Sequence, residues 1–192
     1  MRHILKALFW FASVVVYRIK VNGKENIPKN GAVLLCPNHV HALDSVIMLM
    51  HNKRKINVLA KEELFENHIL SWLAKIFGVY PIKTESADID AIKTALRILK
   101  NQEVLMIFPE GTRNGMAKGV SFKNGPVTIA IKSGTPIVPV GIKGNFKVFS
   151  KIVVNIGKPI DYSQYKDRQK DKELITNLTK ELMEEVIRLR DM

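Results

Sequence analysis

Residues 34–45 of this 192-residue chain read LLCPNHVHALDS. An apolar run over residues 32–36 stops at Pro37, and a second apolar run covers residues 46–50. We expect the first run to form a short buried strand and the second to open a helix. Asn38, two histidines (His39 and His41) and Asp44 fall within seven residues between these runs. In α/β proteins, ligand-binding and catalytic residues are often found where a strand of the sheet is followed by a helix. We therefore predict the functional site at this junction.

A histidine and the aspartate of this junction can form a hydrogen-bonded pair. Residues five apart in one helix point about 140° away from each other, so His39 and Asp44 meet only if His39 lies in the turn before the helix. Pro37 favours such a turn. A carboxylate bonded to one imidazole nitrogen leaves the other free as a base. His41, three positions before Asp44, would be its neighbour on a helix. Spacing alone does not choose between the histidines, and a structural histidine near a strand end is the competing interpretation.

Size and composition limit the class of protein. The chain is long enough for one well-buried α/β domain, and its 46% hydrophobic and 25% charged content is that of a folded protein. The excess of 30 Lys and Arg over 18 Asp and Glu gives a net charge of +12. This indicates an acidic partner such as nucleic acid, anionic lipid, a phosphorylated substrate or an acidic carrier protein. The single cysteine, Cys36, excludes an internal disulfide and fits a reducing compartment.

The first 20 residues have their own pattern. Cations stand at Arg2, Lys6, Arg18 and Lys20, and residues 7–17 between them are apolar and rich in aromatics. Such an 11-residue core is shorter than the roughly 20 residues needed to span a bilayer. No small-residue cleavage site of a secretory signal follows. We predict a helix over residues 1–20 that lies in the lipid interface; the alternative is a helix packed on the domain's own core. Residues 21–192 then form the folded domain.

Apolar strands alternate with amphipathic helices along the rest of the chain. Strands are expected within 21–28, 56–60, 78–82, 103–108, 136–142 and 152–156, and helices within 65–77, 89–99, 125–133 and 174–186. This alternation predicts a single α/β domain in which helices cover a mixed, mostly parallel sheet.

Two blocks of sequence resemble the signatures of the glycerolipid acyltransferase family. The first is Asn38-His39 with Asp44 five residues beyond the histidine, and the second is FPEGTR over residues 108–113. Residues 78–82 (GVYPI) and 137–140 (IVPV) are similar to weaker family blocks, so the resemblance covers roughly residues 20–160. It implies transfer of an acyl group from acyl carrier protein or coenzyme A to the free hydroxyl of 1-acyl-glycerol-3-phosphate. The product would be phosphatidate for phospholipid synthesis.

The resemblance also implies roles for the residues that transfer the acyl group. His39, not His41, would be the base that removes the hydroxyl proton, and Asp44 would orient it. Direct attack by the hydroxyl needs no covalent acyl-enzyme. A tetrahedral oxyanion needs donors already in place, and we expect backbone N–H groups around Gly111 and Thr112 to supply them.

Acceptor binding is implied for a second group of residues. Arg113 and Lys61 suit the acceptor phosphate, and Glu110 would hold an arginine or a glycerol hydroxyl. Glu110 and Arg113 could instead be an ordinary ion pair in a turn, and Lys61 a solvated lysine. Where the family has a phosphate-binding arginine, this chain has Thr84, with Lys83 beside it. Lysine lacks the planar fork of arginine, so this departure leaves the acceptor open.

The resemblance leads to further expectations about partners and place. We expect no metal site and no cofactor beyond the donor thioester, and a peripheral or monotopic protein on anionic lipid at the cytoplasmic face of the cell membrane. An acyltransferase for a different lysolipid is the nearest alternative. A non-catalytic membrane-surface or nucleic-acid-binding protein is the alternative from another class. Aromatics make up 7% of the chain and are not interleaved with Lys and Arg, which argues against nucleic acid.

Overall fold

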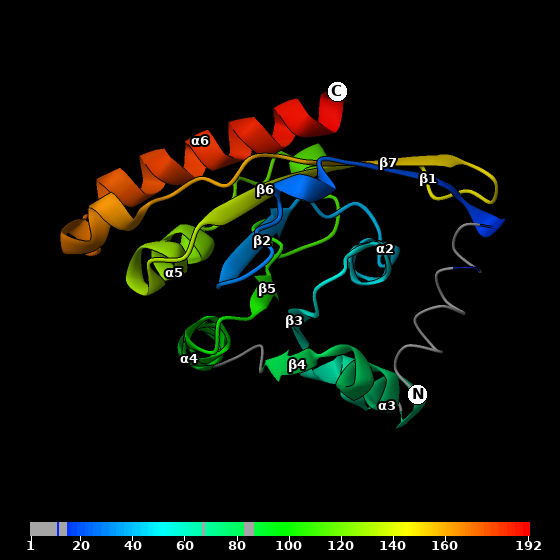
Figure 1. Ribbon diagram of the computed structural model, residues 1–192, viewed down its shortest axis with the longest axis horizontal. Helices are drawn as coiled ribbons and strands as arrows, with labels where there is room; N and C mark the ends of the chain where they lie inside the picture. The colour runs from blue at the N-terminus through cyan, green and yellow to red at the C-terminus, as the bar shows by residue number, and fades with distance from the viewer. Residues whose placement is uncertain (1–10, 12–14, 67, 83–86) are drawn as a thin grey trace.

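The computed structural model describes Phe11 and residues 15–66, 68–82 and 87–192. In this part of the chain seven strands form one sheet in the order β1-β7-β6-β2-β5-β3-β4 (Figure 1). Neighbouring strands are parallel throughout, except that β6 and β7 are antiparallel. The predicted α/β fold with a mixed, mostly parallel sheet is confirmed.

The elements follow the predicted order. The strands are β1 (Arg18–Asn22), β2 (Val33–Pro37), β3 (Ile56–Lys61), β4 (Val79–Ile82), β5 (Val104–Met106), β6 (Ile137–Lys143) and β7 (Lys151–Ile156). The α-helices are α2 (Leu43–His51), α3 (His68–Phe77), α4 (Ala87–Lys100), α5 (Gly125–Ser133) and α6 (Lys172–Asp191). Short 3-10 helices are η1 (Lys24–Asn26), η2 (Glu62–Phe65), η3 (Met116–Lys118) and η4 (Ser163–Arg168).

The core lies on both faces of the sheet, and β2 contributes to each. All five residues of β2 are buried. Because side chains alternate along a strand, Leu34 and Cys36 join the core cluster formed by α4, α5 and α6, whereas Val33 and Leu35 join the cluster on the α2 side. Figure 1 shows α5 and α6 on one side of the sheet and α2 on the other. A strand covered on both faces explains why β2 reads as a continuous apolar run.

The order of the strands brings several loops to one edge of the sheet. Strands β2, β5, β3 and β4 are parallel neighbours, so their carboxyl ends lie at the same edge. The chain after Pro37, after Met106 and after Lys61 leaves the sheet there. Both signature blocks follow strands that end at this edge, as ligand-binding residues do in open α/β sheets.

The N-terminal boundary differs from the prediction. Residues 18–20, expected in an interfacial helix, belong to β1, which pairs in parallel with β7. Ile19 and Val21 pack against the core, whereas Arg18 and Lys20 point outward, a period-2 pattern that the helix prediction overlooked. Residues 1–10 and 12–14 of the predicted helix lie outside the described residues. No helix in the described part of the chain is long and apolar enough to cross a bilayer.

Two other boundaries differ from the predicted ones. The helix predicted over residues 65–77 is α3, which begins at His68, whereas Phe65 ends η2. The strand predicted over residues 103–108 is shorter in the structure, where β5 is Val104–Met106. The chain turns after β1 at Gly23, which adopts a left-handed φ of +74°. A Cβ at Gly23 would collide with the carbonyl oxygen of Ile156, so this turn requires glycine.

Candidate active site

Asn38 fixes the direction in which the chain leaves β2. Its side chain is buried, its Oδ1 accepts a hydrogen bond from the Ile142 N–H (2.6 Å), and its Nδ2 donates to the Ile142 carbonyl (2.9 Å). The amide group thereby extends the pairing of β2 with β6 by one step beyond Pro37. The turn that follows therefore starts from a rigid point of the sheet.

Asp44 holds this turn together. The carboxylate is fully buried, and its Oδ2 lies 2.9 Å from Nδ1 of His39. The same oxygen accepts backbone N–H groups of Val40 (2.7 Å) and His41 (2.8 Å), so the chain curls back over the first turn of α2. This is the geometry that allows residues five apart to meet. Because a carboxylate only accepts hydrogen bonds, the imidazole proton stays on Nδ1 and Nε2 keeps a free lone pair.

The ring of His39 is held by one more contact. It stacks on Phe108, the first residue of the second signature block, with ring centroids 3.9 Å apart and an interplanar angle of 23°. The side chain is 18% exposed. The imidazole is thus fixed on one face and at Nδ1.

His41 has a different environment. It is exposed, its Nδ1 accepts the Leu43 N–H at 3.2 Å, and its ring stacks on Phe146 with centroids 4.5 Å apart. Asp44 contacts the backbone of His41 and not its ring. Spacing alone did not show which histidine pairs with Asp44. In the structure the carboxylate bonds the ring of His39.

Glu110 is buried beside His39 and bonds two backbone groups. Its side chain is 2% exposed, and its two oxygens accept backbone N–H groups of His39 (Oε1, 2.6 Å) and Met116 (Oε2, 2.7 Å). Among the described residues it bonds no arginine side chain, so neither the predicted arginine contact nor the alternative ion pair with Arg113 is formed, and the contact with a glycerol hydroxyl stays a prediction. The reason that no arginine contact forms is burial, because a carboxylate away from solvent is satisfied by nearby backbone donors.

The loop after Glu110 carries the remaining residues of the second block. Gly111, Thr112 and Arg113 are exposed. The Gly111 N–H donates to the Phe108 carbonyl (3.1 Å), so it is not free for an oxyanion. No hydrogen bond from the Thr112 N–H occurs among the described residues. Arg113 has no ion pair or hydrogen bond there either, which leaves a free guanidinium at the rim of the site.

Lys123 is a cation of this site that the sequence analysis missed. Its Nζ and Cε lie 3.2 Å and 2.9 Å from the position that a Cβ on Gly111 would occupy. Its backbone N–H donates to the Pro109 carbonyl at 2.9 Å. The local sequence around Lys123 carries no signal for this placement, because it depends on residues 120–124 folding back against the loop.

The other predicted phosphate-binding residues are placed only in part. Lys61 ends β3, where its backbone pairs with Ile82 of β4, at the same edge as His39. Lys83 and Thr84 lie outside the described residues. Burial raises the pKa of the Cys36 thiol, which agrees with its interpretation as a small apolar residue and not a nucleophile.

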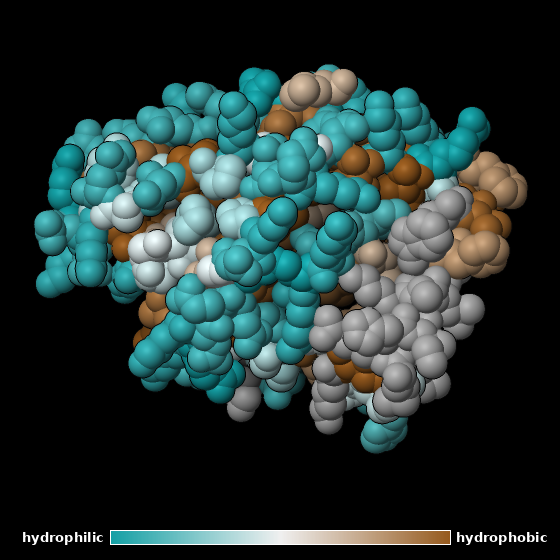
Figure 2. Space-filling view, viewed as in Figure 1, coloured by the Kyte–Doolittle hydropathy of each residue, from teal (hydrophilic) through white to brown (hydrophobic). Residues whose placement is uncertain are grey.

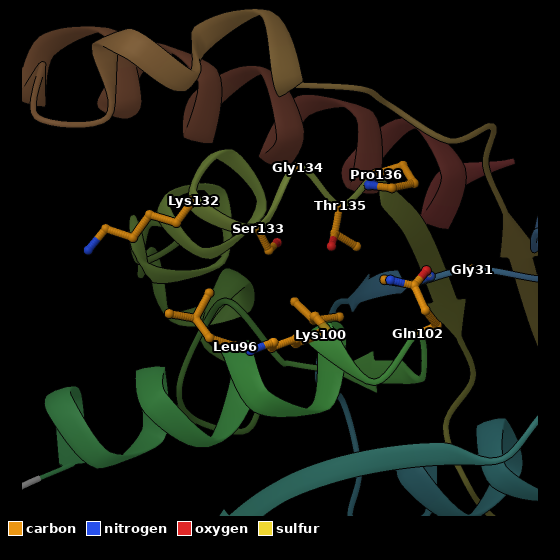
Figure 3. A pocket seen from close by; sticks show the side chains of 11 residues that line it. Gly31, Leu96, Lys100, Gln102, Lys132, Ser133, Gly134, Thr135 and Pro136 are labelled. Carbon is orange, nitrogen blue, oxygen red and sulfur yellow. The ribbon is translucent and has the colours of Figure 1, made fainter.

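A cavity of about 600 Å³ lies away from these residues (Figure 3). It is bounded by the last turns of α4 and α5 and by residues that precede β2, β5 and β6, among them Gln102 and Thr135. Those residues mark the amino ends of the parallel strands. The cavity is therefore at the edge of the sheet opposite the His39–Asp44 pair.

Comparison with known proteins decides the family. The family model described as Acyltransferase matches residues 18–143, which include both signature blocks and Lys123. The chain belongs to the acyltransferase family. The match ends with β6, so β7 and α6 lie beyond it.

Named relatives agree with this membership. The chain is 32% identical to the 1-acyl-sn-glycerol-3-phosphate acyltransferase of Borreliella burgdorferi over 82% of this chain and 63% of the relative. It is 30% identical to the enzyme of the same name from Bacillus subtilis, over 77% of this chain and 76% of that protein. The chain thus spans less than two thirds of the Borreliella relative's length.

A solved structure shares the fold. The crystal structure of the 1-acyl-sn-glycerophosphate (LPA) acyltransferase PlsC from Thermotoga maritima matches with a TM-score of 0.67 and 26% identity. The match covers 95% of this acyltransferase chain and 81% of the Thermotoga chain.

Proposed function

We propose that this chain transfers an acyl group from a thioester to the free hydroxyl of 1-acyl-glycerol-3-phosphate and so forms phosphatidate. The observation that carries the proposal is the buried Asp44 carboxylate on Nδ1 of His39, with Nε2 left as a base. The names of the relatives at about 30% identity support the choice of acceptor.

The reaction follows from this pair. Nε2 of His39 takes the proton of the acceptor hydroxyl as its oxygen attacks the thioester carbonyl. The tetrahedral oxyanion collapses, the carbon–sulfur bond breaks, and the imidazolium returns its proton to the leaving thiolate. Asp44 stabilises the imidazolium in between. The Thr112 N–H is our candidate donor to the oxyanion. No metal or cofactor takes part in this scheme.

The acceptor phosphate needs cations at the same edge of the sheet. Arg113 and Lys123 lie on or against the exposed loop, and the backbone places Lys61 at the same edge. We propose that these three, with Lys83, replace the hydration shell of the phosphate, and that Arg113 gives the strongest contact. The donor is acyl carrier protein or coenzyme A, and the net charge of +12 suits both acidic partners.

We place the enzyme on the cytoplasmic face of the membrane as a peripheral or monotopic protein, because its acceptor is a membrane lipid. Because Thr84 replaces the arginine of the family, one alternative acceptor remains, which is a lysolipid whose phosphate is esterified to a headgroup. The test is an acyl-transfer assay of the purified chain with both donors and with lysophosphatidate, lysophosphatidylglycerol and lysophosphatidylcholine. Preference for lysophosphatidate is expected. Preference for an esterified lysolipid would refute the phosphatidate assignment, and no transfer to any acceptor would refute the activity.

A further inference from the structure

Residues 144–150, which we term the β6–β7 connection, expose apolar side chains. Val148 is 64% exposed and Phe149 is 65% exposed. Figure 2 shows an apolar group at the right edge of the molecule, where Figure 1 shows β6 joined to β7. Two large adjacent apolar side chains in water indicate a surface that another apolar phase covers.

The backbone holds Phe149 outward at a cost. Phe146 and Phe149 have left-handed φ angles of +54° and +62°, which are unfavourable for a bulky residue. The conformation is maintained by hydrogen bonds from the Phe149 N–H to the Val16 carbonyl (2.7 Å) and from the Ser150 N–H to the Lys147 carbonyl (2.9 Å). The exposure of Phe149 is therefore imposed by the fold.

The charged side chains of the connection and of the adjoining strands β1 and β7 are all cations. Nε of Arg18 donates to the Phe149 carbonyl at 3.2 Å, and Lys147 and Lys151 are exposed beside it. No Asp or Glu occurs in residues 1–24 or 143–155. An apolar tip surrounded by cations is complementary to an anionic lipid interface, where the tip enters the acyl boundary and the cations meet the headgroups.

The other side of the connection touches the catalytic turn. Phe146 stacks on His41 with ring centroids 4.5 Å apart and an interplanar angle of 17°, and the His41 N–H donates to Asp44. A lipid surface at Val148 and Phe149 would thus lie beside the turn that carries His39.

We propose that the β6–β7 connection is a membrane-docking surface that inserts Val148 and Phe149 into anionic bilayers, with Arg18, Lys147 and Lys151 at the headgroups. The choice of a lipid partner rests on the proposed function, in which the acceptor is a membrane lipid. The docking surface adjoins the end of the segment predicted to lie in the interface, because Arg18 belongs to that segment and the Phe149 N–H bonds the Val16 carbonyl.

The first experiment measures vesicle binding. The full chain with Val148→Ser and Phe149→Ser is compared with wild type by flotation with phosphatidylglycerol–phosphatidylcholine vesicles, and about a tenfold loss of partitioning is expected. The matched control carries Ile89→Ser and Met192→Ser, which remove side chains that are 66% and 73% exposed on other elements. Unchanged binding of the first variant, or an equal loss in the control, overturns the proposal.

The second experiment reports the environment of the connection in the folded protein. Cys36 is buried and is the chain's single cysteine, so Val148→Cys provides one reactive thiol for an environment-sensitive fluorophore. A blue shift on adding anionic vesicles is expected, with a smaller shift for the same label at Ile89→Cys. No shift overturns docking. A shift that follows protein concentration without vesicles assigns the surface to a second copy of the chain and also overturns it.

Acyl-transfer assays separate this inference from the proposed function. The Val148→Ser, Phe149→Ser variant should keep wild-type activity on a soluble short-chain acceptor and lose activity on a bilayer-embedded one. If wild type inserts into vesicles but transfers no acyl group, the proposed function fails and the docking surface stands. If both acceptors are used equally well by variant and wild type, the docking surface fails and the activity stands.

Discussion

The backbone N–H of His39 donates a 2.6 Å hydrogen bond to Oε1 of Glu110, 71 positions further along the chain. The other oxygen of Glu110 accepts the Met116 N–H, and the Asn114 N–H donates to the His39 carbonyl at 2.6 Å. The peptide that carries the imidazole is thus held on both sides by the loop after β5. Under the proposed function Glu110 is a positioning residue, since it contacts the backbone of His39 and not the substrate.

Glu110→Gln should lower kcat by about 10²-fold with little change in acceptor KM, because the amide NH2 group cannot accept the N–H that bonds the second carboxylate oxygen, and the His39 peptide shifts. Steady-state kinetics with thermal unfolding checks this. Glu184→Gln on the exposed face of α6 is the matched control and should behave as wild type. A rise in KM at constant kcat would instead indicate that Glu110 contacts the substrate.

Gly115→Ala should weaken the same arrangement. A Cβ at Gly115 would lie 2.7 Å from Oε2 and 2.9 Å from Cβ of Glu110, too close for either group to stay in place. We expect a loss of about 1–3 kcal/mol in the free energy of unfolding, together with lower kcat. Gly125→Ala, where a Cβ meets nothing within 4 Å, is the control for urea unfolding. Equal stability of the two variants would contradict the close contact.

His39→Ala should reduce acyl transfer by about 10²–10⁴-fold, whereas His41→Ala should keep most activity. The reason is that Asp44 bonds the ring of His39 and only the backbone of His41. Single-turnover rates for both variants, with circular dichroism to verify folding, provide the measurement. Loss confined to His41→Ala would reverse the assignment of the base.

Arg113→Ala and Lys123→Ala should each raise the KM for lysophosphatidate by about tenfold or more, because charge-assisted hydrogen bonds to phosphate contribute about 1.5–3 kcal/mol each. Little effect is expected on the KM for a lysolipid that carries no charged group near its acceptor hydroxyl. Lys118→Ala, an exposed lysine of η3, is the control. Unchanged KM in Arg113→Ala and Lys123→Ala would place the phosphate elsewhere.

Asp171 links the stability of α6 to pH. The Leu174 N–H and then Arg168 hydrogen-bond its carboxylate and hold its pKa below the ordinary value of 3.8. Because the pKa of Asp171 is lower in the folded than in the unfolded chain, its ionised carboxylate stabilises the folded protein above pH 3.8. This stabilisation is lost as the pH falls through the folded-state pKa. Asp171→Ala should therefore unfold at lower temperature at pH 7, and its difference from wild type should shrink below about pH 3.8. A difference that is constant from pH 7 to pH 3 would mean that the carboxylate charge contributes nothing.

Local patterns in the sequence were enough to predict the order of the helices and strands and the pairing of His39 with Asp44. The apolar run before Pro37 became β2, and the helix predicted over residues 125–133 has those bounds in the structure. His39 and Asp44 were foreseeable as partners because only a turn separates them, and Asp44 itself closes that turn. Each of these features depends on periodicity, proline or short-range hydrogen bonds, all of which act within a few residues.

Long-range contacts decided what the local patterns missed. Arg18 and Lys20 are in a strand because β7, more than 130 positions away, offers an unpaired edge. Glu110 reaches the His39 peptide because β2 and β5 are neighbours in the sheet. Lys123 over Gly111 and Phe146 against His41 likewise depend on loops that meet only in the fold. The order of the strands decides which of these loops meet. That order is determined by burial of the whole hydrophobic core, so no single stretch of sequence predicts it.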